Sequence, residues 1–259
     1  MDNKEQLTLI AKHFYKQRSA ALPHSDLPEG LSVESLDDAL AIQRLLITLN
    51  NDKVYGWKCM TPLADGTIIV APLLKPTDVQ TTTCSLKANN DNNKTSVFIE
   101  PEIAFILEKD LAKNQTFTDS EVDAAFGDAH MALELIQKRF SATGNATSYD
   151  KFADGLFNQG VYLGPKIDKE AAYKAGSFAV TIAQEGNDVL NLSAKHPAEL
   201  PQNPLYWAMN FLSAQGVELK AGQVFITGSY CGLVELDTQK HTEFNYENLG
   251  TMAVTLTLD

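Results

Sequence analysis

The sequence predicts an α+β fold in which a small helical N-terminal region, residues 1–54, precedes a larger strand-rich domain, residues 55–259. Apolar residues recur at helical spacing in two stretches before residue 50. From residue 55 onward, short β-prone runs separated by turn residues take over, and residues 252–258 alternate apolar and polar side chains as a half-buried strand does. Strands with helices inserted among them are typical of α+β proteins.

Two helices account for the N-terminal region. Residues 4–20 place apolar side chains on one helical face, and a turn-rich connector follows at 22–30. The second helix is expected to have Ser32 as its N-cap and Asp37 and Asp38 in its first turn, where acidic side chains favour a helix. It is expected to end at an Asn-rich stretch near residue 50.

Strands dominate the larger domain. The expected strands are 55–60, 67–70, 97–107, 161–165, 178–182, 188–192, 223–228 and 252–258, with a hairpin formed by 178–182 and 188–192. Two helices are expected among them. The first covers 120–140 and begins at acidic residues, and the second covers 204–215, with Gly216 just past its end.

The composition limits the classes of function. The 259 residues carry a net charge of −12, so no basic stripe exists that could neutralise a nucleic-acid backbone. The N-terminus lacks the layout of a signal peptide, and no apolar run is long enough to span a membrane. Three widely spaced cysteines predict neither a disulfide framework nor a zinc site. These features predict a cytoplasmic protein that binds neither nucleic acid nor membrane.

Glu100 and Glu102 lie inside the apolar run 97–107. Because residues i and i+2 of a strand point to the same face, their carboxylates are expected side by side. Adjacent carboxylates in apolar surroundings repel each other and are costly to desolvate, and a hard dication such as Mg²⁺ or Mn²⁺ would relieve both costs. The alternative is a half-exposed strand whose polar face carries the two acids.

Glu134 is a third acidic residue in an apolar segment, within the expected helix 120–140. A lone glutamate there is costly unless it is paired or bound to a cation. Alternatively it lies on the exposed stripe of that helix. His130 would then lie one helical turn away and could hydrogen-bond it, or could equally be on the surface.

Lys58 lies between Trp57 and Cys59 in the expected strand 55–60. Burial between bulky neighbours lowers the pKa of a lysine, which could then move protons near neutral pH. The alternative is an edge-strand lysine that blunts sheet-to-sheet pairing.

The loop that follows the expected strand 223–228 contains Gly228 and Ser229. Its backbone N–H groups and hydroxyl could bind an anion such as a substrate carboxylate. The alternative is an ordinary turn.

Taken together, these segments resemble the fumarylacetoacetate hydrolase superfamily, and within it the branch of 2-oxopent-4-enoate (2-hydroxypentadienoate) hydratases and 4-oxalocrotonate decarboxylases. The resemblance extends over nearly the whole chain. The motifs that carry it, in family order, are Tyr55-Gly56-Trp57-Lys58, Asp65-Gly66-Thr67-Ile68, Ile99-Glu100-Pro101-Glu102-Ile103-Ala104, Ala132-Leu133-Glu134-Leu135, Gly160-Val161-Tyr162-Leu163-Gly164 and Gly222-Gln223-Val224-Phe225-Ile226-Thr227-Gly228-Ser229.

The resemblance implies the mixed β-roll of that superfamily, with flanking helices and the helical N-terminal region before it. It implies that Glu100, Glu102 and Glu134 are ligands of Mg²⁺ or Mn²⁺, and that Lys58 is the active-site lysine. Pro101, between two of these ligands, removes a strand N–H and therefore predicts an edge or a bulge there.

The remaining site residues also follow from the resemblance. Asp65 would act with the lysine, and Asn158, Gly228 and Ser229 would bind the substrate. Two departures from the family pattern stand out, since Ala64 precedes Asp65 where an acidic residue is usual, and the stretch before Gly160 is shortened. The sequence leaves open whether Asp65 is equivalent to the family's acidic residue.

The function implied is that of a metal-dependent carbon–oxygen lyase, a hydratase adding water to a 2-hydroxy-dienoic or 2-oxo-alkenoic acid through a metal-bound enolate. Such enzymes serve the catabolism of aromatic compounds, and a homo-oligomer with a possible pathway-enzyme partner is expected. The alternatives are a decarboxylase or C–C hydrolase of a related 2-oxo acid, a non-catalytic partner subunit, and a metal-independent isomerase or tautomerase using Lys58. The sequence does not decide among these reactions, and it does not identify the exact substrate.

Overall fold

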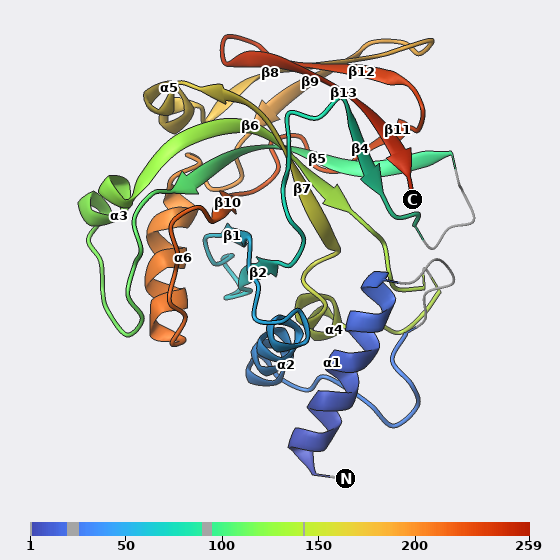
Figure 1. Cartoon of the computed structure of the whole chain (residues 1–259), viewed down its shortest axis with the longest axis vertical. Helices are drawn as coiled ribbons and strands as arrows, with labels where there is room; N and C mark the ends of the chain where they lie inside the picture. The colour runs from blue at the N-terminus through green and yellow to red at the C-terminus, as the bar shows by residue number, and fades with distance from the viewer. Residues whose placement is uncertain (1, 20–25, 90–94, 142) are drawn as a thin grey trace.

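Two β-sheets and six helices make up the described part of the chain in the computed structural model, which covers residues 2–19, 26–89, 95–141 and 143–259 (Figure 1). The first sheet has eight strands. Seven of them, in spatial order, are β2 (Ile69–Leu73), β1 (Gly56–Met60), β10 (Val224–Ile226), β5 (Ser96–Leu107), β6 (Phe126–Ile136), β7 (Asn158–Ile167) and β3 (Asp78–Val79). The eighth strand, β11 (Val234–Asp237), pairs with β5.

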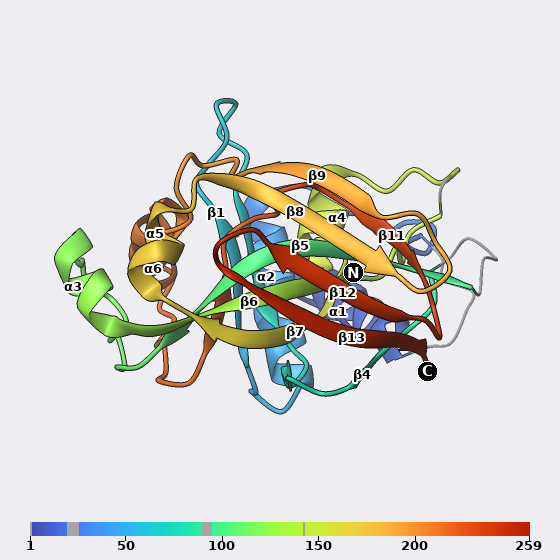
Figure 2. The same ribbon diagram turned by 90° about the horizontal axis from the view of Figure 1, so that it is seen from above.

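The second sheet lies across the first, as the view from above shows (Figure 2). Its five strands, in spatial order, are β4 (Thr83–Leu86), β13 (Gly250–Leu258), β12 (His241–Tyr246), β8 (Ser177–Gln184) and β9 (Leu190–Lys195). The six helices are α1 (Asn3–Ser19), α2 (Leu36–Leu49), α3 (Asp119–Ala125), α4 (Ser148–Ala153), α5 (Lys169–Lys174) and α6 (Asn203–Ala214). None of these helices is long and apolar enough to cross a membrane.

The eight-stranded sheet is rolled. β2 and β7 lie far apart in strand order, yet Leu73 of β2 packs in one small cluster with Val161 and Leu163 of β7. Ala104 of β5 and Ala132 of β6 belong to the same cluster. Because side chains alternate between the faces of a strand, this cluster marks the inner face of the roll. The expected mixed β-roll with flanking helices is confirmed.

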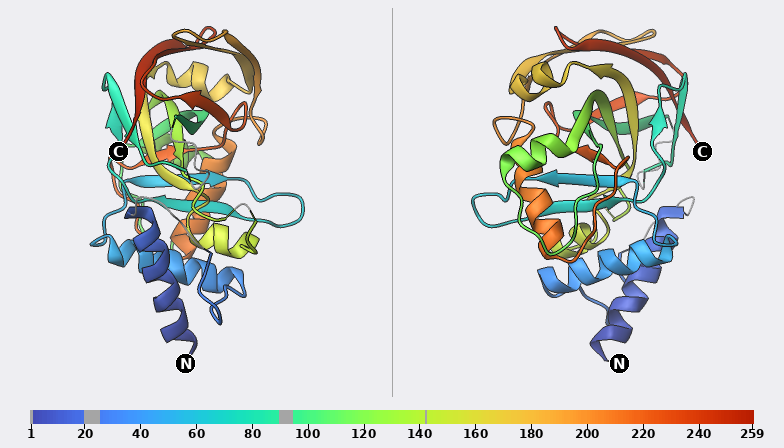
Figure 3. Two further views of the ribbon diagram at one scale, coloured as in Figure 1. Left: turned by 90° about the vertical axis from the view of Figure 1, so that its right-hand side faces the viewer. Right: turned by 60° about the vertical axis from the view of Figure 1, so that its left-hand side comes forward.

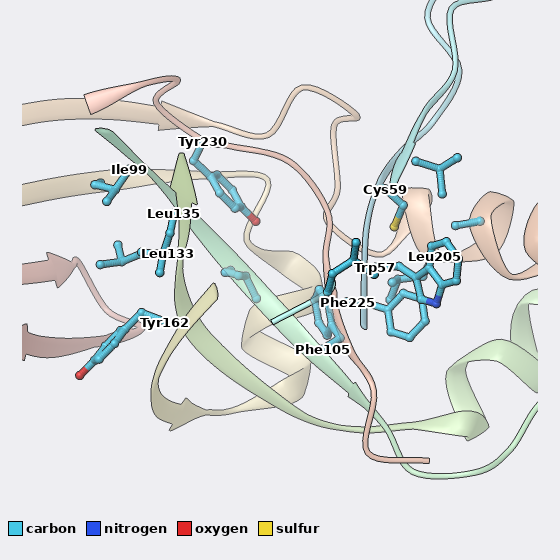
Figure 4. Packing of buried hydrophobic residues seen from close by; sticks show 14 of the residues in the cluster. Trp57, Cys59, Ile99, Phe105, Leu133, Leu135, Tyr162, Leu205, Phe225 and Tyr230 are labelled. Carbon is cyan, nitrogen blue, oxygen red and sulfur yellow. The ribbon is translucent and has the colours of Figure 1, made fainter. Parts of the chain in front are cut away.

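The main core lies on the outer face of the roll, between the two sheets and along the helices. The buried residues drawn in Figure 4 include Ile99, Leu133, Leu135 and Tyr162 on β5, β6 and β7, and Trp57 and Phe225 near Leu205 of α6. Tyr246 of the second sheet donates its hydroxyl to the Ala132 carbonyl at 3.0 Å, which joins the two sheets. The first sheet is therefore buried on both faces over β5 and β6.

The N-terminal helices share this core with the strands. Ile10 and Phe14 of α1 and Ile42 of α2 are buried in the main cluster. The Gln43 side chain donates to the carbonyl groups of Val70 at 3.1 Å and Phe152 at 2.8 Å, which ties α2 to β2 and α4. The two helices end before β1 begins, and the boundary between residues 54 and 55 stays a prediction.

The expected helix over 120–140 is wrong. A capping box between Thr118 and Glu121 does start a helix, but that helix ends at Ala125 and residues 126–136 form β6. β6 pairs with β5 on one side and β7 on the other. A strand buried on both faces has a continuous apolar run without a period of two, which single-sequence reasoning cannot separate from a buried helix. His130 consequently contacts the Gly164 carbonyl at 2.9 Å, and the expected helical-turn relation to Glu134 is wrong.

Smaller differences concern caps and short elements. Ser35, rather than Ser32, is the N-cap of α2, since its hydroxyl accepts the Asp38 N–H at 3.1 Å. The elements that were not predicted from the sequence are α4, α5, β3, β4, β11 and β12. The predicted hairpin is confirmed as β8 and β9. Three of these strands, β3, β4 and β11, pair with strands far away in the chain, so their local sequence carries little signal.

Candidate metal centre

Three glutamates converge on the inner face of the roll. Glu100 of β5 lies directly opposite Glu134 of β6, and Glu102 follows two residues along on the same face. One carboxylate oxygen from each of the three lies within 4.8 Å of the others. Strand pairing therefore brings together acids that are 34 positions apart in the sequence.

Burial makes this cluster unstable as three free carboxylates. Glu102 is 1% exposed and Glu134 is 0% exposed, while Glu100 is half-buried. Burial, together with the negative charge of Glu134, raises the pKa of Glu100 to about 7. Burial first, and then the other two acids, raises the pKa of Glu102 well above its ordinary value. A dication would relieve the repulsion and replace the lost water.

Lys58 of β1 points into the same space. It pairs laterally with Ile226 of β10, which pairs with Ala104 of β5, so all three share the inner face. The Lys58 ammonium donates to Glu134 Oε1 at 2.8 Å, and its side chain is 12% exposed. β1 lies between β2 and β10, so the edge-strand alternative is wrong.

The predicted lowering of the Lys58 pKa is also wrong. Burial by itself lowers the pKa, but the negative charges of Glu134, Glu100 and Glu102 more than offset it, and the net shift is upward. The neighbours of Lys58 in the sequence are apolar, whereas the acids that face it come from β5 and β6. In this protein Lys58 is an ammonium held in place by Glu134.

Asn158, at the start of β7, supports the same carboxylate. Its side chain is 1% exposed and donates to Glu134 Oε1 at 2.9 Å and to the Gly160 carbonyl at 3.2 Å. Two donors thus hold Glu134 Oε1, while Glu134 Oε2 is buried and has no partner among the described residues. A buried carboxylate oxygen without a donor is the group that a cation would coordinate. Substrate binding by Asn158 stays a prediction.

The loop after β10 covers a gap beside Pro101. β11 pairs with β5 up to Ile99 and β10 pairs from Ala104, so neither strand reaches Pro101. The loop fills the gap, because Tyr230 N donates to the Pro101 carbonyl at 3.2 Å. The N–H and C=O of one residue point to the same side of a strand. The backbone nitrogen of Pro101 therefore also faces this gap, and the N–H that proline lacks removes no hydrogen bond to β6.

Gly228 and Ser229 lie in this loop. Gly228 N donates to Glu102 Oε2 at 2.8 Å, and the backbone there has φ +120°, a conformation that favours glycine. The Ser229 hydroxyl donates to the Gly232 carbonyl at 3.1 Å. The loop therefore orients a predicted metal ligand, and its role in holding substrate stays a prediction.

Asp65 is not brought to the carboxylates. It lies on the turn between β1 and β2, is exposed, and accepts the Thr67 N–H at 2.9 Å. The β1–β2 loop extends away from the body of the molecule (Figure 3). The catalytic role implied for Asp65 by the resemblance therefore has no support from its position.

A cavity of about 620 Å³ opens from the metal centre. Lys58 and Glu100 line one part of it. The apolar residues that line the rest include Ile69, Ile136, Phe140, Leu156, Phe157 and Leu233. Two further lysines, Lys138 and Lys151, also line it. Sequence reasoning missed this lining, because most of it comes from segments 136–157 whose fold no local pattern indicated.

The curated relatives of the chain are hydratases. It is 26% identical over 160 residues to a 2-keto-4-pentenoate hydratase of Burkholderia vietnamiensis (strain G4 / LMG 22486), covering 61% of this chain and 60% of that protein. It is 30% identical over 170 residues to a 2-oxo-hept-4-ene-1,7-dioate hydratase of Escherichia coli, covering 60% of each chain. The chain thus matches about three fifths of the length of these relatives, and no family model matches it.

Solved structures show the fold. A 4-oxalocrotonate decarboxylase from Pseudomonas putida G7, complexed with magnesium and adipate, superposes with a TM-score of 0.76 at 16% identity and covers 98% of both chains. The chain has the fold of 4-oxalocrotonate decarboxylase. The same enzyme complexed with calcium and acetate gives a TM-score of 0.73. The resemblance to the hydratase and decarboxylase branch is confirmed, and a divalent metal fits the three glutamates.

Proposed function

We propose that this protein is a hydratase that adds water to a 2-hydroxy-dienoic or 2-oxo-alkenoic acid with the help of Mg²⁺ or Mn²⁺. One observation carries the proposal: three glutamate oxygens lie within 4.8 Å of one another on the inner face of the roll, and Lys58 donates to one of those glutamates. The hydratase relatives support it, and the decarboxylase structure holding magnesium supports the choice of metal.

Glu100, Glu102 and Glu134 would hold the metal. Carboxylate oxygens are the ligands that Mg²⁺ and Mn²⁺ prefer, and the buried Glu134 Oε2 has no other partner among the described residues. When bound, the dication supplies Lewis-acid polarisation of a 2-oxo or 2-hydroxy group. Gly228 and Asn158 keep Glu102 and Glu134 in place for this task.

Lys58 would transfer the protons. Its ammonium is fixed by the 2.8 Å bond to Glu134 and lines the cavity, so it can deliver a proton to the distal carbon of a dienolate, the substrate that has lost its enol proton to solvent, as this becomes the conjugated ketone. The resulting amine can accept a proton from the water whose oxygen adds to the double bond, and the ammonium formed again can protonate the carbon of the enolate that this addition leaves. The residues that exclude bulk water from this step are the apolar lining, above all Phe140 and Phe157.

The cavity also indicates the chain of the substrate. The apolar wall suits the unsaturated carbons, and Lys138 and Lys151 add positive charge to a cavity that otherwise carries the acidic cluster. The Lys138 ammonium lies 3.6 Å above the centre of the Phe98 ring, which holds it beside the cavity. This arrangement favours substrates with a second carboxylate over substrates with an apolar tail.

A decarboxylase or C–C hydrolase of a related 2-oxo acid is the second candidate. The superposition on 4-oxalocrotonate decarboxylase over 98% of both chains favours it, because hydration and decarboxylation both use polarisation of the same 2-oxo group. A non-catalytic partner subunit is a weaker candidate, since it would not need a buried lysine among three acids. A cytoplasmic homo-oligomer remains part of the proposal.

The test is the variant Glu102→Gln, with Glu108→Gln as a matched control because Glu108 is an exposed glutamate just beyond the end of β5. Turnover of 2-hydroxypentadienoate and of 2-oxo-hept-4-ene-1,7-dioate is followed with Mg²⁺ or Mn²⁺, by product analysis that separates hydration from carbon dioxide release. We expect Glu102→Gln to abolish metal-dependent turnover and Glu108→Gln to retain it. Unchanged turnover in Glu102→Gln, or full activity after metal removal, overturns the proposal.

A further inference from the structure

A second cavity lies behind the metal centre, where the C-terminal end of α1 meets β7 and the segment after β4. Its volume is about 260 Å³, and it shares no lining residue with the larger cavity. Four cationic side chains line it: Arg18, Lys75, Lys87 and Arg139. Within the described residues, no aspartate or glutamate lines it. This is unusual in a chain with 33 acidic and 21 basic residues.

The two arginines share one buried carboxylate. Arg139 is 2% exposed, and its Nε and Nη2 donate to the Asp154 carboxylate at 3.0 Å and 2.6 Å. Arg18 Nε lies 4.0 Å from the same carboxylate, and both side chains are largely buried. One negative charge faces two positive charges, so one guanidinium charge is left without a buried counter-charge. Such an imbalance is costly in a protein interior.

Arg18 has the capacity to bind a further group. Its Nη1 donates to the Asn158 carbonyl at 3.0 Å and its Nη2 donates to the Asp154 carbonyl. Its Nε is buried and has no hydrogen-bond partner among the described residues. Burial, and then the charge of Arg139, lowers the pKa of Arg18 to about 10, although Asp154 acts in the opposite direction.

The lysines add to this excess at the rim. Lys75 is exposed and makes no hydrogen bond or ion pair within the described part of the chain, and Lys87 Nζ lies 3.3 Å from the Asp259 carboxylate, whose side chain is 41% exposed. Four cations therefore face two acids, Asp154 and Asp259, neither of which lines the cavity. A net positive cavity with unused donors suits an anion with several oxygen acceptors.

We propose that this cavity binds a small oxyanion of the sulfate or phosphate class, held by Arg18, Lys75 and Lys87. The site adjoins the metal centre through Asn158, whose carbonyl accepts from Arg18 and Arg139 at 3.0 Å and 3.1 Å and whose side chain donates to Glu134. The anion site therefore lies one residue from a predicted metal ligand. It does not depend on the proposed reaction.

Sulfate is the probe, because it keeps Mg²⁺ in solution. Calorimetric titration and thermal unfolding of the full chain with Mg²⁺ are compared between sodium sulfate and sodium chloride at equal ionic strength. We expect saturable sulfate binding with a matching rise in Tm. Lys75→Gln is expected to weaken sulfate affinity roughly tenfold. Lys195→Gln, which removes an exposed lysine on β9 that lines neither cavity, is expected to leave it unchanged.

Two further variants keep the test decisive. Lys87→Gln is measured beside Arg18→Gln, so that a folding defect in the arginine variant leaves a second informative substitution. Glu102→Gln removes a predicted metal ligand, and sulfate binding that persists there separates this site from the metal centre and from the proposed function. Equal shifts with chloride and sulfate, or unchanged sulfate affinity in Lys75→Gln and Lys87→Gln, would overturn the proposal.

Discussion

The metal centre and the basic cavity behind it are built on opposite charges. In the first, three glutamates face one lysine, and burial raises the pKa of Glu100 to about 7. In the second, two largely buried arginines face one aspartate, and burial lowers the pKa of Arg18 to about 10. Each cluster carries charge that its own side chains do not balance, so each fits a ligand of the opposite sign.

Asn158 separates the two clusters. Its backbone carbonyl accepts from the arginines, and its side chain donates to Glu134. The uncompensated negative charge therefore lies toward the larger cavity and the uncompensated positive charge lies toward the smaller one. The ion pairs alone would suggest that both clusters are structural salt bridges. The net charge of each buried cluster is what indicates a ligand and the sign of its charge.

Loss of the lysine should have the largest effect on the negative cluster. Lys58→Met removes the proton-transferring group while keeping a side chain of similar length, and we expect kcat to fall by about 10²–10⁴-fold. Metal binding should persist, because the three glutamates remain. The measurement is kcat together with Mn²⁺ affinity, and a variant that keeps wild-type kcat would remove Lys58 from the mechanism.

Breaking the positive cluster should cost stability next. Asp154→Asn leaves Arg18 and Arg139 without their shared counter-charge in a site where Asp154 is 0% exposed. We expect the free energy of unfolding to fall by about 3 kcal/mol, measured by urea denaturation. Sulfate should recover part of that loss if the positive charge is uncompensated. A neutral effect of the substitution would show that the arginines do not depend on Asp154.

The pH dependence of stability should distinguish metal-free from metal-loaded protein. The folded pKa of Glu100 is about 7 against an ordinary 4.5, so its stabilising contribution is complete below about 4.5 and is lost as the pH rises through 7. The metal-free protein should therefore lose stability over this range. Mg²⁺ needs the deprotonated acids, so the rise in Tm on adding Mg²⁺ should grow from pH 5 to pH 8. A rise in Tm independent of pH would contradict the carboxylate site.

The smallest effect is expected in the outer part of the larger cavity. Lys138→Gln should raise KM for a substrate with a second carboxylate by roughly tenfold and leave KM for 2-hydroxypentadienoate unchanged. The control is Lys195→Gln, a substitution of an exposed lysine on β9. Steady-state kinetics on both substrates give the ratio of the two KM values. An equal change in KM for both would show that Lys138 does not contact the second carboxylate of the substrate.

Two of the three glutamates in the negative cluster could be predicted from their spacing in the sequence alone. The i, i+2 spacing of Glu100 and Glu102 in an apolar run predicts two adjacent carboxylates on a strand, and the structure has them on β5. Glu134 was different. Its segment, buried on both faces, has no strand period, so it was expected on a helix, and only the family resemblance joined it to the other two acids.

The chemistry of Lys58 could not be predicted locally. Its neighbours Trp57 and Cys59 suggested a lowered pKa, but the charges that decide the shift belong to β5 and β6, far away in the sequence. The positive cluster gave no signal at all, since Arg18, Lys75 and Arg139 come from three distant segments. Electrostatics depends on tertiary neighbours, which a single sequence does not display.

Titration of the metal-free protein with Mn²⁺ by calorimetry tests the central claim most directly, with Glu102→Gln and Glu108→Gln measured alongside. Three converging carboxylates predict one Mn²⁺ per chain, release of protons on binding below pH 7, and loss of binding in Glu102→Gln but not in Glu108→Gln. Equal Mn²⁺ affinity in wild type and Glu102→Gln, or binding without proton release, would contradict the account.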